Sequence, residues 1–274
     1  MTMTKISLIL IVGVLSLACL LACGSVMNDQ IQEMNSSEKK FNEAQSQRVV
    51  AFMSLEVMFP DASVRALAKA AGEGNIQKVE QLVKEGVSVN SKGTQGVTPL
   101  YWALRNYNGF KRLLELGADP NVVFGNGGGG SVLHAAVGAK DDRLLKAVLQ
   151  HGGNPNLIDN QSGETPLFSA LDVGDAALNM LFAAGADINA KNRLGNTVTM
   201  VAAGRGHYEI VYRFLERGAD FKIKSLNGKD LADWVAFNVG LLRPESDSAK
   251  WQTKVIEWLR AKGVEIPASP PRRQ

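Results

Sequence analysis

The sequence predicts an all-α solenoid, in which short helix–turn–helix units are stacked side by side and joined by β-hairpin fingers. A glycine after a leucine-rich stretch recurs at intervals of 31, 35, 33, 33 and 45 residues. These glycines are Gly86, Gly117, Gly152, Gly185, Gly218 and Gly263. Thr-Pro-Leu or a related triplet follows at residues 98–100, 131–133, 165–167 and 197–199. A period near 33 residues indicates stacked supersecondary units rather than a closed globular core.

Each predicted unit contains the same three elements. Thr98-Pro99 suits a helix start, because the hydroxyl can cap backbone N–H groups and proline loses no hydrogen bond in the first turn. An apolar pair in the second helix predicts its buried stripe. The pairs are Leu82-Val83, Leu113-Leu114, Val148-Leu149, Met180-Leu181, Phe214-Leu215 and Trp258-Leu259. The glycine that follows each pair predicts a left-handed turn that ends the helix.

The segments after the glycines carry a family resemblance. They read GVSVN, GADPN, GGNPN, GADIN and GADFK. Together with the Thr-Pro-Leu triplets they resemble the ankyrin repeat, G-x-TPLHxAA-x-x-G-x-x-x-x-V-x-x-LL-x-x-GADxN. The resemblance covers residues 61–266 and implies an ankyrin-repeat solenoid of five to six repeats. It also implies that His134 ties neighbouring loops together and that His207 begins a second helix.

The two end units depart from this pattern. The first lacks Thr-Pro and is entered through residues 60–63, and the last has an insertion from Asn238 to about Ala249. A final helix is expected at Lys250–Leu259, followed by a disordered tail at residues 267–274. Residues 23–60 are polar over most of their length and predict a tether, with a short helix near residues 38–50.

The N-terminus predicts a secreted, lipid-anchored protein. Lys5 precedes an apolar run that ends in Leu20-Leu21-Ala22-Cys23, which resembles the lipobox of bacterial lipoproteins. By this resemblance residues 1–22 are a signal peptide and Cys23 carries the lipid. Gly24 favours the outer membrane, with the protein facing the periplasm. An uncleaved anchor helix, or cleavage after Ala18, is the alternative.

Composition excludes several function classes. The chain has 274 residues, of which 45% are hydrophobic and 21% charged, and its formal net charge of +3 is too low for a dedicated nucleic-acid binder. Because its two cysteines, Cys19 and Cys23, lie before residue 24, the remainder holds no disulfide, zinc–cysteine site or cysteine nucleophile. No motif indicates an enzyme, a metal site, a cofactor or a small-molecule substrate. The glycine-rich stretch 125–131 lacks the lysine of a phosphate loop and is interpreted as an elongated finger.

One row of residues is the best candidate for binding a protein partner. The exposed position of the first helix recurs as Lys69, Trp102, Ala135, Ser169, Val201 and Trp234. Tryptophans on an exposed concave surface are typical of binding hot spots. Candidate contacts beside the row are Arg105, Arg205, Tyr101 and, on the elongated finger, Phe124. Alternatively, Trp102 packs on Arg105 and Tyr107, and Trp234 packs on the C-terminal insertion.

The lipobox and the tether are followed by the segments FPDASVRALAKAAGEGN and GVTPLYWALRN and by an ending that reads LADWVAF…WLRAKGVEI. With these features the whole chain resembles ankyrin-repeat immunity lipoproteins that neutralise antibacterial lipases of type VI secretion systems. This resemblance implies a non-enzymatic, membrane-tethered protein that binds a lipase toxin in the periplasm. An envelope scaffold or stress-associated ankyrin protein, supporting a resident periplasmic enzyme, is the alternative. We expect Trp102→Ala to weaken partner binding by more than about 1 kcal/mol and to leave the melting temperature nearly unchanged.

Overall fold

The structure, a computed structural model, describes residues 54–125 and 130–266. The predicted signal peptide, Cys23 and the tether up to residue 53 lie outside the described residues, as do residues 126–129 and the predicted tail. Ser54–Gln274 forms one compact unit of the chain. Within the described ranges no helix is long and apolar enough to cross a bilayer.

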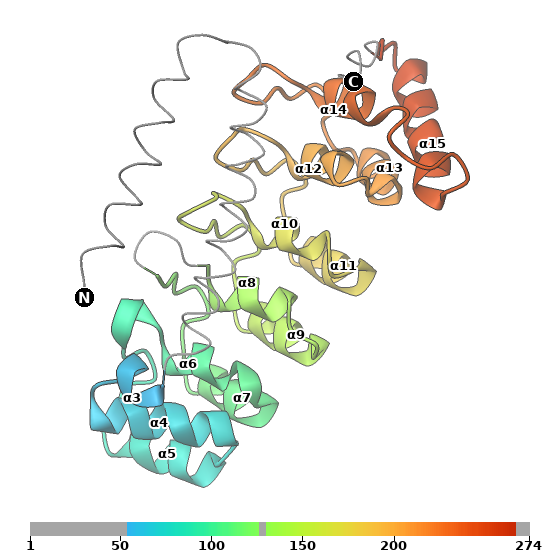
Figure 1. Ribbon diagram of the computed structural model, residues 1–274. Coiled ribbons are helices and arrows are strands. Elements are labelled where there is room, and N and C mark those ends of the chain that lie inside the picture. The colour runs from blue at the N-terminus through green and yellow to red at the C-terminus, as the bar shows by residue number, and fades with distance from the viewer. Residues whose placement is uncertain (1–53, 126–129, 267–274) are drawn as a thin grey trace, which may run out of the picture. The chain divides into compact units, whose positions relative to one another are not determined.

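Six pairs of helices stack in chain order within the described residues (Figure 1). The first helices are α4 (Ala62–Glu73), α6 (Pro99–Trp102, extended by η3, Ala103–Arg105), α8 (Val132–Val137), α10 (Pro166–Ala170), α12 (Val198–Gly204) and α14 (Leu231–Asn238). The second helices are α5 (Ile76–Lys84), α7 (Tyr107–Glu115), α9 (Asp142–Gln150), α11 (Asp175–Ala183), α13 (Tyr208–Glu216) and α15 (Asp247–Ala261). Finger loops project from the side of the first helices in Figure 1, and the second helices lie on the other side.

The predicted helix starts are correct in position, but the predicted role of threonine is wrong at two of them. Pro99 and Pro166 occupy the first helical position. However, the hydroxyls of Thr98 and Thr165 are buried and accept no hydrogen bond from the helix. In contrast, Thr197 accepts from the Met200 N–H at 3.2 Å, in a helix that has no proline. Proline therefore fixes the backbone at the starts of α6 and α10 without help from a hydroxyl cap.

The core is a continuous apolar layer between neighbouring units. Every apolar pair predicted for the second helices contributes at least one buried residue, for example Leu113 and Leu181, which are fully buried. The first helices approach closely through small residues such as Ala71 and Ala203. The core thus runs along the whole stack, and each unit is stabilised by its neighbours.

The glycines that define the period end the second helices as predicted. Their φ angles lie between 77° and 97°, in the left-handed region that glycine adopts without a Cβ clash. They are Gly86, Gly117, Gly152, Gly185, Gly218 and Gly263.

The fingers are tighter than the predicted β-hairpins. Among the described residues there is no strand, and only two isolated antiparallel bridges occur, Val123 with Ser131 and Lys191 with Thr197. Backbone hydrogen bonds close the turns, for example from the Asn192 N–H to the Asn196 carbonyl at 2.9 Å, and further backbone bonds join neighbouring fingers. The Arg193 N–H donates to the Ser162 carbonyl at 2.7 Å, and the Leu226 N–H donates to the Leu194 carbonyl at 3.0 Å.

The stack begins before the predicted boundary at residue 61. Helix α3 (Leu55–Met58) and Phe59 lie in the segment assigned to the tether, yet Met58 and Phe59 are fully buried. The hydroxyl of Thr94 donates to the Val57 carbonyl at 2.7 Å and joins this segment to the first finger. At the other end α15 covers the helix predicted at residues 250–259 and exceeds it on both sides.

Candidate binding surface

The predicted binding residues form one line along the first helices. We call this line the first-helix row, and it comprises Lys69, Trp102, Ala135, Ser169, Val201 and Trp234, one from each first helix. Lys69 and Ser169 are exposed, and the other four are half-buried. The row therefore presents a surface to solvent, but its two tryptophans also serve the packing of the stack.

Trp102 is packed between neighbours on three sides. A Cβ built on Gly72 of α4 would lie only 2.8 Å from its indole ring, so the ring rests directly on that glycine. The Phe59 ring meets it edge-on at 6.5 Å, and the Arg105 guanidinium carbon lies 3.4 Å from its ring centroid. The predicted alternative contact with Arg105 is confirmed. Tyr107 instead lies beneath Arg143, at 4.4 Å.

Trp234 sits in the same frame at the other end of the stack. Its ring covers Gly204 of α12, where a Cβ would lie 3.0 Å from the ring. Each tryptophan follows its glycine by 30 residues, so both side chains fill the same hollow on the preceding repeat. The Trp234 indole N–H is buried and has no hydrogen-bond partner within the described residues. The contact with Gly204 shows that Trp234 packs on the preceding repeat, and its predicted packing on the C-terminal insertion stays a prediction.

The two candidate arginines have different surroundings. Arg105 is exposed beside Trp102, and no carboxylate of the described residues pairs with it. Arg205 pairs with Asp172 of the preceding repeat at 2.7 Å, and His207 Nε2 lies 3.1 Å from the same carboxylate. The Arg105 guanidinium therefore keeps its N–H donors for an external carboxylate, whereas those of Arg205 already face Asp172.

The sequence interpretation placed Phe124 among the candidate partner contacts, but its side chain does not face solvent. Its side chain is only 8% exposed, and its ring packs on Tyr101 at a centroid distance of 4.3 Å. Burial also raises the pKa of the Tyr101 phenol above its ordinary value. The base of the elongated finger is thereby anchored on α6, and the Phe124 ring is unavailable as a first contact.

The histidines have structural positions. His134 Nδ1 accepts from the Ser131 N–H at 3.1 Å, and its Nε2 lies 3.1 Å from the Glu164 carbonyl oxygen in the next finger. Desolvation by burial lowers the pKa of His134, which favours the neutral ring. His207 stands at the start of α13, as the resemblance implied, although its side chain makes no capping hydrogen bond. His151 Nδ1 lies 2.8 Å from the Ala147 carbonyl at the end of α9.

An asparagine ladder joins the repeats, and the sequence interpretation missed it. The side chain of Asn121 donates to the Gly152 carbonyl at 3.0 Å and accepts from the Asn154 N–H at 2.7 Å. Asn90 and Asn156 make the same two contacts with the following unit. The signal was present, because these asparagines end the GVSVN, GADPN and GGNPN segments. An amide can donate and accept at once, so one side chain satisfies two backbone groups.

The acids that lie in turns bind backbone groups. Asp159 Oδ1 accepts from the Gln161 and Ser162 N–H groups at 2.7 and 2.6 Å. Burial by itself raises the pKa of Asp159, but the hydrogen bonds from Ser162, Gln161 and Glu164 outweigh it and hold the pKa below its ordinary value. Within the described residues no group of three histidine, cysteine, aspartate or glutamate side chains is arranged to hold a metal ion.

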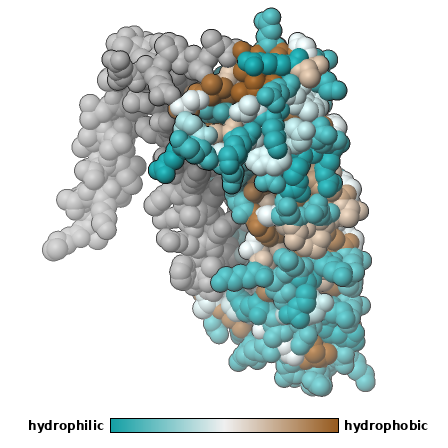
Figure 2. Space-filling model, turned by 90° about the vertical axis from the view of Figure 1, so that its right-hand side faces the viewer, coloured by the Kyte–Doolittle hydropathy of each residue, from teal (hydrophilic) through white to brown (hydrophobic). Residues whose placement is uncertain are grey.

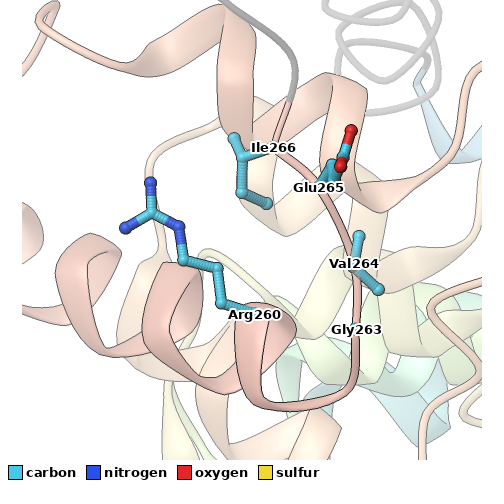
Figure 3. Close-up of a pocket in the computed structure, with 5 residues that line it drawn as sticks. All are labelled: Arg260, Gly263, Val264, Glu265 and Ile266. Atoms are coloured by element: carbon cyan, nitrogen blue, oxygen red, sulfur yellow. The ribbon is translucent and has the colours of Figure 1, made fainter.

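A hollow at the C-terminal end offers no chemistry (Figure 3). It measures about 480 Å³ and is lined by Arg260, Gly263, Val264, Glu265 and Ile266. Arg260 and Glu265 are its only charged residues, and no nucleophile or histidine lines it. The first-helix row therefore stays the better candidate for a binding function.

The outer side of the second helices carries one apolar region. Figure 2 looks onto the side of the second helices, where the surface is largely hydrophilic, and shows apolar side chains gathered at the end formed by α14 and α15. Phe237, Val239 and Leu241, at the end of α14 and in the turn that follows, are 55%, 38% and 58% exposed.

Comparison with known families gives a match over most of the stack. The family model for ankyrin repeats (three copies) matches residues 48–123 and 133–225. Protein PhlB of Serratia liquefaciens is 34% identical over 148 residues, which are 53% of this chain and 64% of that protein. The putative palmitoyltransferase ZDHHC13 of Danio rerio is 29% identical over 185 residues, 65% of this chain and 28% of that protein. The chain thus spans less than two thirds of the length of these relatives.

Two solved structures share the architecture. One is an immunity protein, Bd3460, solved in complex with the predatory endopeptidase Bd0816 from Bdellovibrio bacteriovorus. It is 26% identical, with a TM-score of 0.56, and the match covers 69% of this chain and 97% of that chain. The ankyrin repeat protein EF0377 is 25% identical, with a TM-score of 0.57, over 71% of this chain and 97% of that chain.

Proposed function

Because the chain belongs to the ankyrin-repeat family, we propose that it is a non-enzymatic binding protein whose first-helix row holds one protein partner. The single observation that carries this proposal is the pair formed by Trp102 and Arg105. A half-buried indole lies beside an exposed guanidinium that pairs with no carboxylate of the described residues. Tryptophan and arginine are the residue types most enriched in binding hot spots.

The geometry of this pair suits recognition of a protein surface. The Trp102 ring is held in place by Gly72 and Phe59, so little side-chain freedom is lost when a partner covers it. The Arg105 guanidinium carries five N–H donors in a fixed plane and can bind a carboxylate or backbone carbonyls. Lys69, one repeat earlier in the row, is exposed but lies 4.0 Å from the Glu73 carboxylate in an ion pair. Among the described residues, the N-terminal half of the row thus offers an aromatic anchor beside one guanidinium that pairs with no carboxylate, that of Arg105.

We propose further that the partner is a hydrolytic enzyme and that binding neutralises it. The similarity to an immunity protein solved with an endopeptidase supports this role. The resemblance to immunity lipoproteins favours a lipase toxin. In this proposal Cys23 is lipidated, and the polar tether holds the stack at the periplasmic face of the outer membrane.

A second candidate is an envelope scaffold or stress-associated protein that supports a resident periplasmic enzyme. The same row would serve both functions. They differ in outcome: an immunity protein protects cells only from an incoming toxin, whereas a scaffold changes the activity of an enzyme that the cell itself makes.

Affinity capture with the full chain in its bacterial host tests the binding site. We expect the wild-type chain to capture a hydrolase. The Arg105→Ala chain should capture at least about tenfold less of it. Arg260→Ala, which removes an exposed arginine from α15, is the matched control and should bind like wild type. Equal capture by all three chains would refute the assignment of the row. Addition of the captured enzyme's substrate then separates neutralisation, in which turnover stops, from scaffolding, in which turnover continues.

The anchoring proposal has its own test. Wild-type protein should appear in the outer-membrane fraction with a lipid-modified Cys23, and Cys23→Ser should not. Recovery of unmodified wild-type protein in the soluble fraction would contradict the anchor and leave the binding row unaffected.

A further inference from the structure

The tips of the last two fingers form a surface that the first-helix row does not include. We call it the finger ridge and define it by Lys191, Arg193, Leu194, Lys224, Leu226 and Lys229. The two tips lie side by side, because the Leu226 N–H donates to the Leu194 carbonyl at 3.0 Å. A Cβ on Gly195 would lie 3.3 Å from Leu226 Cγ, so the second tip also packs on the first.

Two leucines project from this ridge. Leu194 is 52% exposed, and Leu226, at 81%, has the highest exposure among the large hydrophobic residues described. The turn itself does not require a leucine. In the hydrogen bond between the preceding two fingers, the acceptor at the position equivalent to Leu194 is the carbonyl of a serine, Ser162. These apolar side chains therefore contribute little to folding and remain available to an external surface.

The charge around the leucines has one sign. Segments 188–196 and 221–229 contain five lysines and arginines and no aspartate or glutamate. Within the described residues Lys191, Lys224 and Lys229 make no ion pair. The Arg193 guanidinium donates to the backbone carbonyl of Asn160 and pairs with no carboxylate of the described residues.

The acids at the bases of these two fingers bind backbone groups. Asp187 accepts from the Asn189 N–H at 2.8 Å, and Asp220 accepts from the Lys222 N–H at 2.9 Å. Asp230 caps α14 through the Ala232 N–H at 2.9 Å, and Asp233 accepts from the Asp230 N–H. None of these acids forms an ion pair with the cations at the tips, which keep their charge for an external anion.

From these features we infer that the finger ridge docks on an anionic phospholipid surface. Leucines that enter the headgroup region, surrounded by lysines that meet lipid phosphates, are the combination that binds proteins to membrane interfaces. A protein partner is the less suitable occupant, because interfaces between proteins are depleted in lysine and enriched in aromatic residues and arginine. Trp102 and Trp234 of the first-helix row, with Arg105 beside it, supply those enriched types, whereas the finger ridge has three lysines, one arginine and no aromatic side chain. The inference does not depend on the proposed partner or on Cys23.

Lipid contact at the ridge can be measured on the full chain. A Leu226→Cys substitution, with Cys19 and Cys23 changed to serine, accepts one polarity-sensitive fluorophore at the second tip. We compare vesicles of phosphatidylcholine with vesicles that also contain phosphatidylglycerol. We expect a blue shift, and quenching by brominated lipid, on the anionic vesicles only. The same fluorophore on Lys146→Cys, at an exposed position of α9, should show neither change.

Charge reversal supplies the matched comparison. Lys224→Glu with Lys229→Glu should weaken the anionic-vesicle signal at least about tenfold, because each basic residue near the surface adds to the attraction. Lys84→Glu with Lys146→Glu makes the same change in net charge on the second helices and should leave the signal intact. An equal loss in both double variants, an equal signal on both vesicle types, or a shift caused only by an added acidic protein would overturn the inference.

Discussion

The two ends of the repeat stack close in different ways. At the N-terminal end α3 and Phe59 cover the first repeats, and Trp102 is packed against Phe59, Gly72 and Arg105. At the C-terminal end Trp234 covers Gly204, but Phe237 and the turn after it stay exposed. The same tryptophan–glycine contact therefore lies in a closed environment at one end and in an open one at the other.

The position of Phe237 explains the difference. Phe237 comes 33 residues after Gly204 and occupies the equivalent position in its own repeat. At Gly204 this position is covered by a side chain of the following repeat, Trp234. No further first helix follows among the described residues, and α15 packs on α13 and α14. Because a repeat stack is stabilised by neighbouring interfaces, the two ends can be altered separately.

The largest expected effect is at the closed end. Gly109→Ala would place a Cβ 1.8 Å from the Ala71 carbonyl oxygen, where α7 approaches α4, so the two helices must separate. We expect the free energy of unfolding to fall by more than about 3 kcal/mol in denaturant titration.

Gly138→Ala is the control for this substitution. A Cβ at Gly138 would lie 3.9 Å from the nearest atom, the Ala135 carbonyl oxygen, and the backbone φ of Gly138 is an ordinary helical one. The free energy of unfolding should therefore change by less than about 1 kcal/mol. Equal losses for both variants would show that the close approach at Gly109 does not limit stability.

Trp102 and Trp234 should respond differently to substitution. Trp102→Ala removes the contacts with Phe59, Gly72 and Arg105 and should lower the free energy of unfolding by about 2–4 kcal/mol. This stability loss replaces the earlier expectation of an unchanged melting temperature. Trp234→Phe should cost less than about 1 kcal/mol, because it also removes a buried N–H without a partner. A larger loss for Trp234→Phe would reverse the comparison.

His134 allows the middle of the stack to be weakened by pH. Because burial lowers the pKa of His134 in the folded state, the unfolded chain binds a proton first as pH falls. Stability is complete above the ordinary histidine pKa, about 6.5, and declines below it by at most about 1.4 kcal/mol per pH unit. His134→Gln should remove this part of the slope in unfolding titrations. An unchanged slope would assign the pH dependence to other groups.

The asparagine ladder should contribute less to stability than the close approach at Gly109 or the packing of Trp102. Asn121→Ala removes two hydrogen bonds between repeats and should lower the free energy of unfolding by about 1–2 kcal/mol. Asn189→Ala, nearer the open end, removes the bond from the Asp220 N–H and should cost about half as much. Thermal unfolding of the two variants provides the comparison, and a larger loss for Asn189→Ala would contradict it.

The sequence by itself determined the repeat architecture. Proline at helix starts and glycine at helix ends act on the backbone within a few residues, so their effect can be read locally, and their recurrence near every 33 residues identifies the repeat. For this reason the six left-handed glycines, the buried stripes and the positions of His134 and His207 agree with the structure.

Only the tertiary structure decided how the repeats meet. Phe124 packs on Tyr101, Trp102 rests on Gly72, and Asn121 bonds to the following unit; these partners are separated by 23 to 33 residues. The buried, unbonded hydroxyls of Thr98 and Thr165 also depend on this packing. Such contacts depend on how one unit is offset against the next. The period of the sequence gives the spacing of the units along the chain, but it does not specify which side chains face each other between two units.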